Sequence, residues 1–412
     1  MMNSLPIDGD RLWAALMEMA EIGATEKGGN CRLALSDEDK AGRDLFVSWA
    51  EESGYGLVTD AIGNLFVRRE GTDPSLPPVV VGSHLDTQPT GGRFDGVYGV
   101  LAGLEVLRSL DDRGVKTRHA VELAVWMNEE GARYSPPMMG SGVWAGIFAE
   151  DDILDKRAQD GARLGDDLVR LGWRGAAAAD YGVHPFAAYF EAHIEQGPIL
   201  EHEGTSVGVV TGAQAQHWFE VTVTGQDAHA GPTPMRLRKD ALVGAARIVD
   251  LVNRIGKEGG EEACATVGIL DVFPHSRNVI PGKVFLTVDL RHPDDATLHG
   301  FVERFRSGTQ SICADLGLGV EIADFWDFAA TPFDPALVGR VREAAGKFGF
   351  SHRDIVSGAG HDAVYVARVA PTAMVFIPCE GGISHNEAEN IAPEDAARGA
   401  AVLYDAIAAT AE

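Results

Sequence analysis

The sequence contains few cysteines, and they are not arranged as pairs. Its four cysteines, Cys31, Cys264, Cys313 and Cys379, are scattered along 412 residues. Their spacing therefore indicates neither a disulfide framework nor a cysteine-based zinc site. A reducing cytoplasm is the compartment that we expect for such a chain.

The chain is also short of positive charge. It carries 35 basic against 61 acidic residues, a net charge of −26. This balance argues against a nucleic-acid partner, because phosphates would be repelled. It does not exclude an anionic small substrate, since one local arginine can outweigh a distant field that salt screens.

Long apolar runs are missing as well. No stretch approaches the roughly 18 apolar residues of a membrane span. The first twenty residues lack the basic segment and apolar run of a signal peptide. We therefore expect no membrane partner. With 45% apolar and 23% charged residues, the composition is ordinary for a globular protein, and the length suggests two or three domains.

The stretch from residue 79 to 96 carries the first chemical signal. Three consecutive valines predict a buried strand, and His84 and Asp86 follow two apart, on one side of an extended chain. A metal-bound histidine usually donates its other ring N–H to a carboxylate, and Asp86 is placed to accept it. The turn at Gly91-Gly92 could bring Asp95 beside His84. The alternative is a polar strand end, which we would prefer for His84 alone but not for the three residues together.

Further strands are expected to end near the same place. A helix over 98–110 and a strand over 120–126 complete a βαβ unit that delivers Asn128-Glu129-Glu130, and a strand over 189–195 brings His193. Ligands bind beyond the carboxyl ends of such strands. Elsewhere, Ser36 and Asp39 predict a capped helix that runs to Gly54. A hairpin is expected over residues 56–69, and a helical region over residues 150–187.

The pattern changes near Gly212. Alternating strands near 215–224, 264–271, 284–291 and 318–325, with helices over 240–255 and 295–315, indicate a self-contained sheet with two helices. After Thr331 the α/β pattern resumes. The expected fold is α/β, with a mixed, mainly parallel sheet in a discontinuous catalytic domain (1–211 and 330–412) and an inserted α+β dimerisation or lid domain (212–329).

Five metal-ligand candidates lie in four separate stretches: His84, Asp95, Glu130, His193 and His385. Three histidines and two carboxylates suit two first-row ions that share one carboxylate, for which Asp95 is the natural choice. Each residue alone has an ordinary structural explanation that is at least as good. Their joint position at predicted strand ends favours the metal centre.

The chain resembles the peptidase family M20 metallohydrolases, of the amidase, hydantoinase/carbamoylase type. The resemblance spans nearly the whole chain and six ordered motifs: Gly-Ser-His-Leu-Asp-Thr-Gln-Pro-Thr-Gly-Gly-Arg-Phe-Asp-Gly (82–96), Asn-Glu-Glu-Gly (128–131), His-Ile-Glu-Gln-Gly-Pro (193–198), Gly-Gln-Asp-Ala-His-Ala-Gly-Pro-Thr-Pro-Met (225–235), Gly-Ala-Gly-His-Asp-Ala (358–363) and Ser-His-Asn-Glu (384–387). The group contains N-carbamoyl-L-amino-acid hydrolases, β-ureidopropionases and allantoate amidohydrolases. Gly96 after Asp95 is similar to the carbamoylase type, whereas peptidases commonly have a second acidic residue there.

The resemblance implies a role for each site residue. His84, Asp95 and His193 would hold one divalent ion and Asp95, Glu130 and His385 the other, the ions being Zn, Mn, Co or Ni. Glu129 would be the general base, with Asp86 supporting catalysis. Gln196, Asn278, Arg291 and Gly360 would bind the substrate, and His229 would stabilise the oxyanion in the partner subunit of a homodimer.

The chemistry agrees with these roles. Because a ureido carbonyl is a poor electrophile, two ions that polarise it and generate a hydroxide are useful. An imidazole such as His229 can stabilise an oxyanion by roughly 3 kcal/mol. Arg291 offers bidentate hydrogen bonds to a carboxylate. Without the resemblance, His229 would be interpreted as a turn histidine and Arg291 as a surface arginine.

The expected activity is removal of the carbamoyl group from an N-carbamoyl-L-amino acid or N-carbamoyl-β-alanine. Allantoate is the nearest alternative substrate, and Gln88-Pro89-Thr90 is more similar to the carbamoylase branch. A dipeptidase or N-acyl amino acid deacylase of the same family is a further alternative, distinguished by a carboxylic acid product. A non-catalytic binding protein is expected to have lost the base or a ligand, and here all are present.

Overall fold

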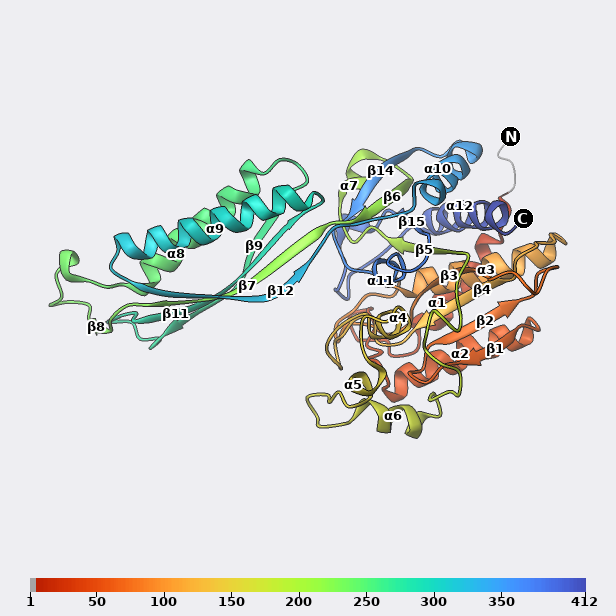
Figure 1. Cartoon of the computed structure of the whole chain (residues 1–412), viewed down its shortest axis with the longest axis horizontal. Coiled ribbons are helices and arrows are strands. Elements are labelled where there is room, and N and C mark those ends of the chain that lie inside the picture. Colours follow the sequence, from red (N-terminus) through yellow and green to blue (C-terminus); the bar gives the residue numbers. More distant parts are fainter. Residues whose placement is uncertain (1–4) are drawn as a thin grey trace. The chain divides into compact units, whose positions relative to one another are not determined.

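The computed structural model describes residues 5–412, and the chain divides into two compact units. The first unit comprises the chain up to Gly212 together with Pro332–Glu412, and the second comprises Ala213–Thr331. In Figure 1 the second unit is the green and cyan part of the chain.

A nine-stranded sheet forms the centre of the first unit. Its order is β1-β2-β4-β3-β5-β15-β6-β13, with β14 also paired to β6. The pairs β3–β4, β3–β5 and β5–β15 are parallel, and antiparallel pairs flank them. The predicted α/β class with a mixed, mainly parallel sheet is confirmed. The strands are β1 (Gly56–Thr59), β2 (Leu65–Arg69), β3 (Val79–His84), β4 (Val121–Trp126), β5 (Ala188–Ile194), β6 (Val207–Ala213), β13 (Thr331–Pro332), β14 (His352–Ser357) and β15 (Thr372–Ile377).

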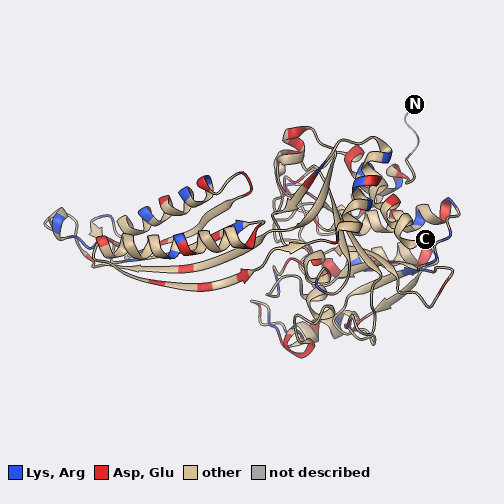
Figure 2. Cartoon of the chain, turned by 45° about the horizontal axis from the view of Figure 1, so that its top comes forward, with Lys and Arg blue, Asp and Glu red and all other residues tan. Residues whose placement is uncertain are grey.

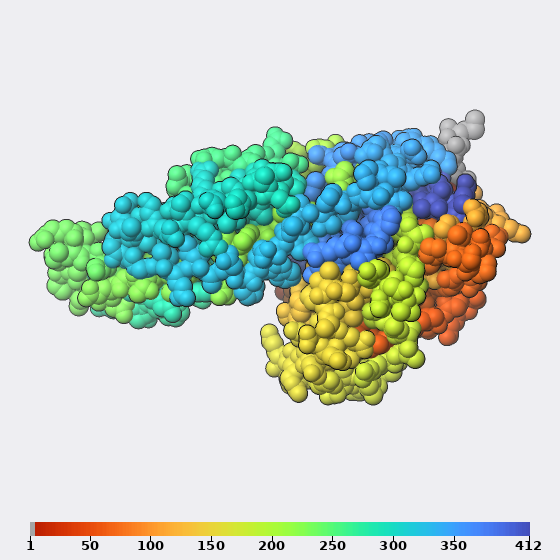
Figure 3. Space-filling model, viewed as in Figure 1, coloured from red at the N-terminus to blue at the C-terminus, as the bar shows by residue number. Residues whose placement is uncertain are grey.

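Helices cover this sheet, and those from the two ends of the chain pack together. Helix α3 (Val97–Asp112) contacts α12 (Pro393–Ala411), and α12 in turn contacts α1 (Gly9–Ala20) and α10 (Pro335–Phe348). Figure 3 shows the dark blue C-terminal surface beside an orange surface from the early part of the chain, within this unit. The remaining helices are α2 (Asp37–Glu52), α4 (Met139–Trp144), α5 (Glu150–Leu154), α6 (Leu164–Leu171), α7 (Ile199–Glu203), α11 (Asp362–Val366) and the 3₁₀ turn η2 (Glu380–Gly382).

Two local predictions can be compared directly with the structure. Ser36 caps α2, its hydroxyl accepting from the Asp39 amide at 3.1 Å, as predicted. The prediction of a helical region over 150–187 is wrong for its second half. Helix α6 ends at Leu171 because Gly172 takes a left-handed conformation, and residues 172–187 follow as turns and irregular chain.

The second unit is a four-stranded antiparallel sheet with two helices on one face. The strand order is β12-β7-β11-β9, and α8 and α9 pack on it over a core that includes Phe219, Val221 and Leu286. Figure 2 shows basic and acidic residues interspersed along both helices, where pairs such as Arg254–Asp250 form. Its elements are β7 (Ala215–Thr224), β8 (Ala228–His229), η1 (Met235–Leu237), α8 (Ala241–Glu258), β9 (Cys264–Phe273), β10 (Val279–Ile280), β11 (Lys283–His292), α9 (Asp295–Asp315) and β12 (Gly319–Phe328).

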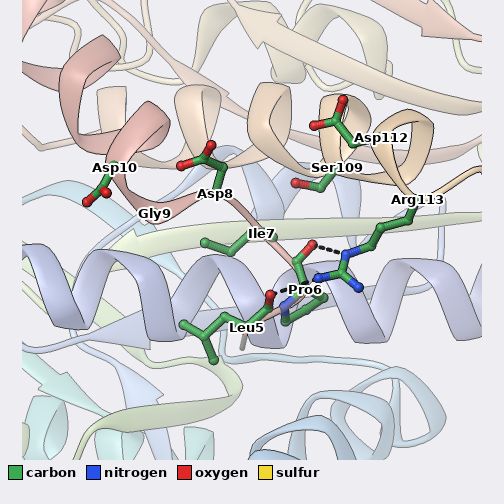
Figure 4. Close-up of a pocket in the computed structure, with 9 residues that line it drawn as sticks. All are labelled: Leu5, Pro6, Ile7, Asp8, Gly9, Asp10, Ser109, Asp112 and Arg113. Carbon is green, nitrogen blue, oxygen red and sulfur yellow. Dashed lines mark hydrogen bonds between the residues drawn. The ribbon is translucent and has the colours of Figure 1, made fainter. Parts of the chain in front are cut away.

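A pocket near the start of the described chain is not a candidate for the catalytic site. It lies between residues 5–10 and the end of α3, where the Arg113 guanidinium donates to the carbonyl oxygens of Leu5 and Pro6 (Figure 4). Its lining includes no histidine and no predicted site residue. Separately, none of the helices within residues 5–412 combines the length and hydropathy needed to cross a membrane.

Candidate metal centre

Adjacent parallel strands bring the predicted ligands to one edge of the sheet. His84 is the last residue of β3 and pairs with Trp126, the last residue of β4, so Glu129 and Glu130 follow directly beyond that edge. His193 lies one residue before the end of β5, the other neighbour of β3. Parallel pairing therefore brings residues from three distant stretches of sequence together at one site.

Asp95 lies at the centre of this site, and its two oxygens face different groups. Oδ1 lies 3.7 Å from Nε2 of His84 and 3.2 Å from Nε2 of His193. Oδ2 lies 3.3 Å from Nε2 of His385, which is itself 3.3 Å from Oε2 of Glu130. The sets His84–Asp95–His193 and Asp95–Glu130–His385 each have ligand atoms within 4.8 Å of one another. A carboxylate in this arrangement can bridge two cations.

The histidine rings on the strands are oriented by backbone carbonyls. Nδ1 of His84 lies 2.9 Å from the Asp86 carbonyl oxygen, and Nδ1 of His193 lies 2.9 Å from that of Ile194. A carbonyl can only accept, so Nδ1 carries the hydrogen in each ring. In the neutral imidazole each Nε2 lone pair is then on the side of Asp95, where that of His193 accepts the Gly96 amide at 3.2 Å. This is the tautomer that a metal requires.

The Asp86 carboxylate does not have the predicted role. Its Oδ1 is 3.9 Å from His84 Nδ1, because the backbone carbonyl of the same residue takes that position. The carboxylate instead accepts the amides of Glu129 and Glu130, each at 3.2 Å. The prediction that Asp86 orients His84 through its carboxylate is therefore corrected: this side chain holds the turn that carries the two glutamates.

Gly96 is required beside the cluster for two reasons. Its φ is +68°, a region that favours glycine, and a Cβ there would lie 2.3 Å from the His84 ring. Non-glycine residues with positive φ also occur here, at Asn128, Gln196 and His385. Such conformations concentrate at functional sites, where surrounding contacts hold them.

Burial and crowding of carboxylates shift the titration of the site. Burial, followed by the charges of Asp362 and Glu130, raises the pKa of Glu129 well above its usual range. Burial and the charge of Asp95 raise the pKa of Glu130 to about 8. Against the effect of burial, hydrogen bonds from His193 and His385 hold the pKa of Asp95 well below its usual range. The cluster therefore favours positive charge, in the form of protons or of metal cations.

The donor set fits divalent first-row metals. Imidazole and carboxylate ligands suit Zn, Mn, Co and Ni, and four of the five candidate residues are almost fully excluded from water. His385 is the exception, with its side chain 51% exposed. The composition and burial of this cluster suit divalent metal.

Gln196 and Gly360 lie in the same unit as the cluster. The Gln196 amide nitrogen donates to Asp95 Oδ2 at 2.9 Å, and its buried Oε1 has no hydrogen-bond partner among the described residues. That oxygen is available to accept from a ligand. Gly360 immediately precedes His361, a buried histidine whose ring packs 4.5 Å from that of His193.

Three residues beside the cluster were not among the predicted site residues. Gln88 donates to Glu130 Oε2 at 2.7 Å, and Ser384 donates to Asp95 Oδ2 at 2.9 Å. Glu389 accepts the Asp95 amide at 3.1 Å. Gln88 and Ser384 stand next to recognisable motif residues, but no spacing in the sequence indicates that Glu389 reaches back to Asp95.

The other predicted residues belong to the second unit. His229 pairs with Val279 across β8 and β10, and Ala230 donates to the Asn278 carbonyl at 2.9 Å. Nδ1 of His229 accepts the Gly231 amide at 3.1 Å, so the neutral ring carries its hydrogen on Nε2 and can donate it. Arg291 forms an ion pair with Asp289 at 2.7 Å and lies over the Trp218 ring.

Comparison with known proteins identifies relatives across the whole chain. The model of peptidase family M20/M25/M40 matches residues 80–409. An N-carbamoyl-L-amino-acid amidohydrolase of Rhizobium meliloti is 50% identical, with 98% of this chain and 97% of the relative covered. An allantoate amidohydrolase of Bacillus subtilis is 34% identical, with 94% of each covered. A crystal structure of an amidase of the hydantoinase/carbamoylase family from Burkholderia multivorans has a TM-score of 0.96 and 56% identity, covering 99% of both chains.

Proposed function

Since the chain belongs to peptidase family M20/M25/M40, we infer that it hydrolyses the carbamoyl group of an N-carbamoyl amino acid. The relatives are named amidohydrolases, and hydrolysis of an amide bond is the activity of this chain. One water is consumed and its oxygen is added to the carbonyl carbon, both C–N bonds of the ureido group are cleaved, and the products are the amino acid, ammonia and carbon dioxide. The observation that supports this most strongly is the cluster around Asp95, with Glu129 beside it.

We assign one ion to His84, Asp95 and His193, and a second to Asp95, Glu130 and His385. Bound there, divalent ions would polarise the substrate carbonyl and supply a hydroxide near neutral pH. Oε2 of Glu129 is 3.5 Å from His84 Nε2, so its carboxylate borders the first ligand set without belonging to either set. Glu129 takes a proton from the attacking water and gives it to the leaving nitrogen.

We assign substrate binding to four residues. The Gln196 oxygen, which has no partner among the described residues, can accept a ureido N–H. Gly360, which precedes the buried His361, would also contact the substrate. Asn278 and Arg291 would bind the carboxylate that every N-carbamoyl amino acid carries. Substrate would then replace Asp289 as a partner of the Arg291 guanidinium.

Replacement of Arg291 by lysine tests the carboxylate site. Lysine keeps the charge but loses the planar pair of donors, so we expect KM to rise about tenfold or more with a smaller change in kcat. Steady-state kinetics on an N-carbamoyl amino acid measure both constants. An unchanged KM would place the carboxylate elsewhere.

His229 belongs to a different unit from the metal ligands, and we propose that it serves the site of a partner subunit in a homodimer. Glu129→Gln and His229→Ala are each expected to be inactive alone. After subunit exchange, a mixed dimer contains one site in which both residues are intact, and part of the activity returns. Mixed dimers that form but stay inactive would show that His229 does not act across the dimer.

The substrate is tested with a panel of compounds. The metal-loaded protein is expected to release ammonia and a free amino acid from N-carbamoyl-L-amino acids or N-carbamoyl-β-alanine faster than it releases ammonia from allantoate. Allantoate is the second candidate because one relative is an allantoate amidohydrolase, although its identity of 34% is lower than the 50% of the carbamoyl enzyme. Preference for allantoate, or for N-acyl amino acids with release of a carboxylic acid, would overturn the proposal.

A further inference from the structure

A buried carboxylate outside the ligand set holds the Asp95 loop, which we define as residues 91–96. Glu389 is only 1% exposed. Its Oε1 accepts the amides of Phe94 at 2.9 Å and Asp95 at 3.1 Å. Two backbone donors of the loop are therefore satisfied by one side-chain oxygen that comes from the other end of the chain.

The second oxygen of Glu389 reaches Asp95 through a hydroxyl. Ser384 Oγ lies 3.1 Å from Glu389 Oε2 and 2.9 Å from Asp95 Oδ2, the oxygen that faces His385. Gln196 Nε2 donates to the same Asp95 oxygen at 2.9 Å. Both the backbone and the carboxylate of Asp95 are thus fixed by contacts that include Glu389.

The carboxylate of Glu389 lies directly against Gly92 and occupies the space that a side chain at position 92 would need. A Cβ on Gly92 would lie 2.0 Å from Cδ of Glu389. Its φ is outside the left-handed region, so the need for glycine comes from this contact alone. Arg93 adds a second link, donating to the Asn390 side-chain oxygen at 3.0 Å.

Among the histidines of the cluster, His385 is the one whose position depends most on these contacts. It lies in the His385 loop, residues 383–392, a fully described segment without helix or strand. His84 and His193, in contrast, are held in β3 and β5 by pairing along the strands. Apart from an ion pair of Glu387 with Lys27 at 3.4 Å, which does not involve Asp95, the contacts that relate His385 to Asp95 in the described part of the chain are side-chain links between two irregular loops.

We propose that Glu389 is a positioning residue that links the Asp95 loop to the His385 loop and so fixes the Asp95–Glu130–His385 ligand set. The inference rests on the proposed two-metal function. Glu389 holds the Asp95 loop as a hydrogen-bond acceptor, since its Oε1 alone accepts both amides. A glutamine at 389 can keep that oxygen and donate from its amide to Ser384, so it should preserve the link.

The test is calorimetric titration of metal-free protein with Co²⁺ or Zn²⁺, with thermal unfolding of each metal-free variant. Glu389→Ala is expected to weaken one of two binding steps about 10–100-fold, the usual effect of losing a group that supports a metal ligand. That step should be the one that His385→Ala abolishes. Glu389→Gln should bind nearly as the wild type, and Gly92→Ala should resemble Glu389→Ala because its methyl group displaces the carboxylate.

Glu105→Ala is the matched control. Glu105 is 2% exposed and also accepts a backbone amide, from Asp8 at 2.9 Å. Its side-chain partners are Arg11 on α1 and Ser109 on α3, away from the metal ligands. The Glu105→Ala variant should have a lower unfolding temperature than the wild type but the same metal affinity. Wild-type affinities in both Glu389→Ala and Gly92→Ala, or equal weakening in Glu105→Ala, would overturn the inference. If Glu389→Ala does not fold, the metal affinity of Gly92→Ala is the deciding measurement.

The titration separates this inference from the proposed function. A wild-type protein that binds two equivalents of metal but releases no ammonia from any N-carbamoyl amino acid contradicts the function and leaves the link to be judged by its own variants. A wild-type protein that binds no divalent metal overturns both.

Discussion

Replacement of Glu129 by glutamine is expected to lower kcat by about 10²–10⁴-fold while both metals remain bound. The substitution preserves the shape of the side chain and removes only its ability to accept a proton. Glu129 is 8% exposed and belongs to neither ligand set. Steady-state kinetics and elemental analysis of the same sample measure the two expected outcomes.

Glu130→Gln is the matched control, because it makes the same chemical change one residue away. Oε2 of Glu130 lies 3.3 Å from Nε2 of His385, and we expect this variant to lose metal occupancy. Its activity should recover partly when metal is added in excess. Metal loss in Glu129→Gln together with full occupancy in Glu130→Gln would show that the two roles are reversed.

Removal of the metals is expected to abolish activity entirely. Imidazole and carboxylate ligands do not select strongly among first-row ions, so Mn, Co, Ni or Zn should each restore turnover to the chelated protein. The carboxylates crowded around Asp95 would then lack the cations that balance them, and the metal-free protein should also unfold at a lower temperature. Thermal unfolding and an activity assay before and after addition of each ion provide the measurement.

Full activity in protein shown by elemental analysis to be free of metal would contradict this expectation. It would remove the role assigned to all five ligand candidates. Asp95→Ala supplies an independent control, because Asp95 belongs to both ligand sets. It should prevent reactivation by any of the four ions.

The positions of His84, Glu130 and His193 could be predicted because strand ends have a clear sequence signal. A short apolar run predicts a buried strand, and parallel pairing brings the carboxyl ends of neighbouring strands together. The prediction that the Gly91-Gly92 turn returns Asp95 to His84 agrees with their separation of 3.7 Å. For these residues, strand ends and a turn that can be recognised in the sequence were sufficient to predict that they lie together.

Other features depend on contacts that no local pattern encodes. The carbonyl of Asp86, rather than its carboxylate, meets the His84 ring, and this choice depends on the path of the Glu129–Glu130 turn. Glu389 reaches a loop almost 300 positions away, and the donors that it meets there are backbone amides, which do not depend on residue type and so leave no sequence signal. The helix ends at Leu171 because Gly172 takes a left-handed conformation, a stop signal that the prediction of a helical region over 150–187 did not take into account.

The roles of His229, Asn278 and Arg291 come from the resemblance and stay predictions. The local structure of their unit is consistent with them, since His229 can donate from Nε2 and Arg291 presents its guanidinium beside Asp289. Their sequence neighbourhood offered only ordinary explanations, a turn histidine and a strand arginine.

Anomalous diffraction from crystals of cobalt-loaded Glu129→Gln protein, grown with an N-carbamoyl amino acid, tests the metal centre most directly. Two anomalous peaks are expected, one among His84, Asp95 and His193 and the other among Asp95, Glu130 and His385. The ureido carbonyl of the intact substrate should lie beside them. A single peak, peaks remote from Asp95, or a ureido group bound away from both ions would contradict the account.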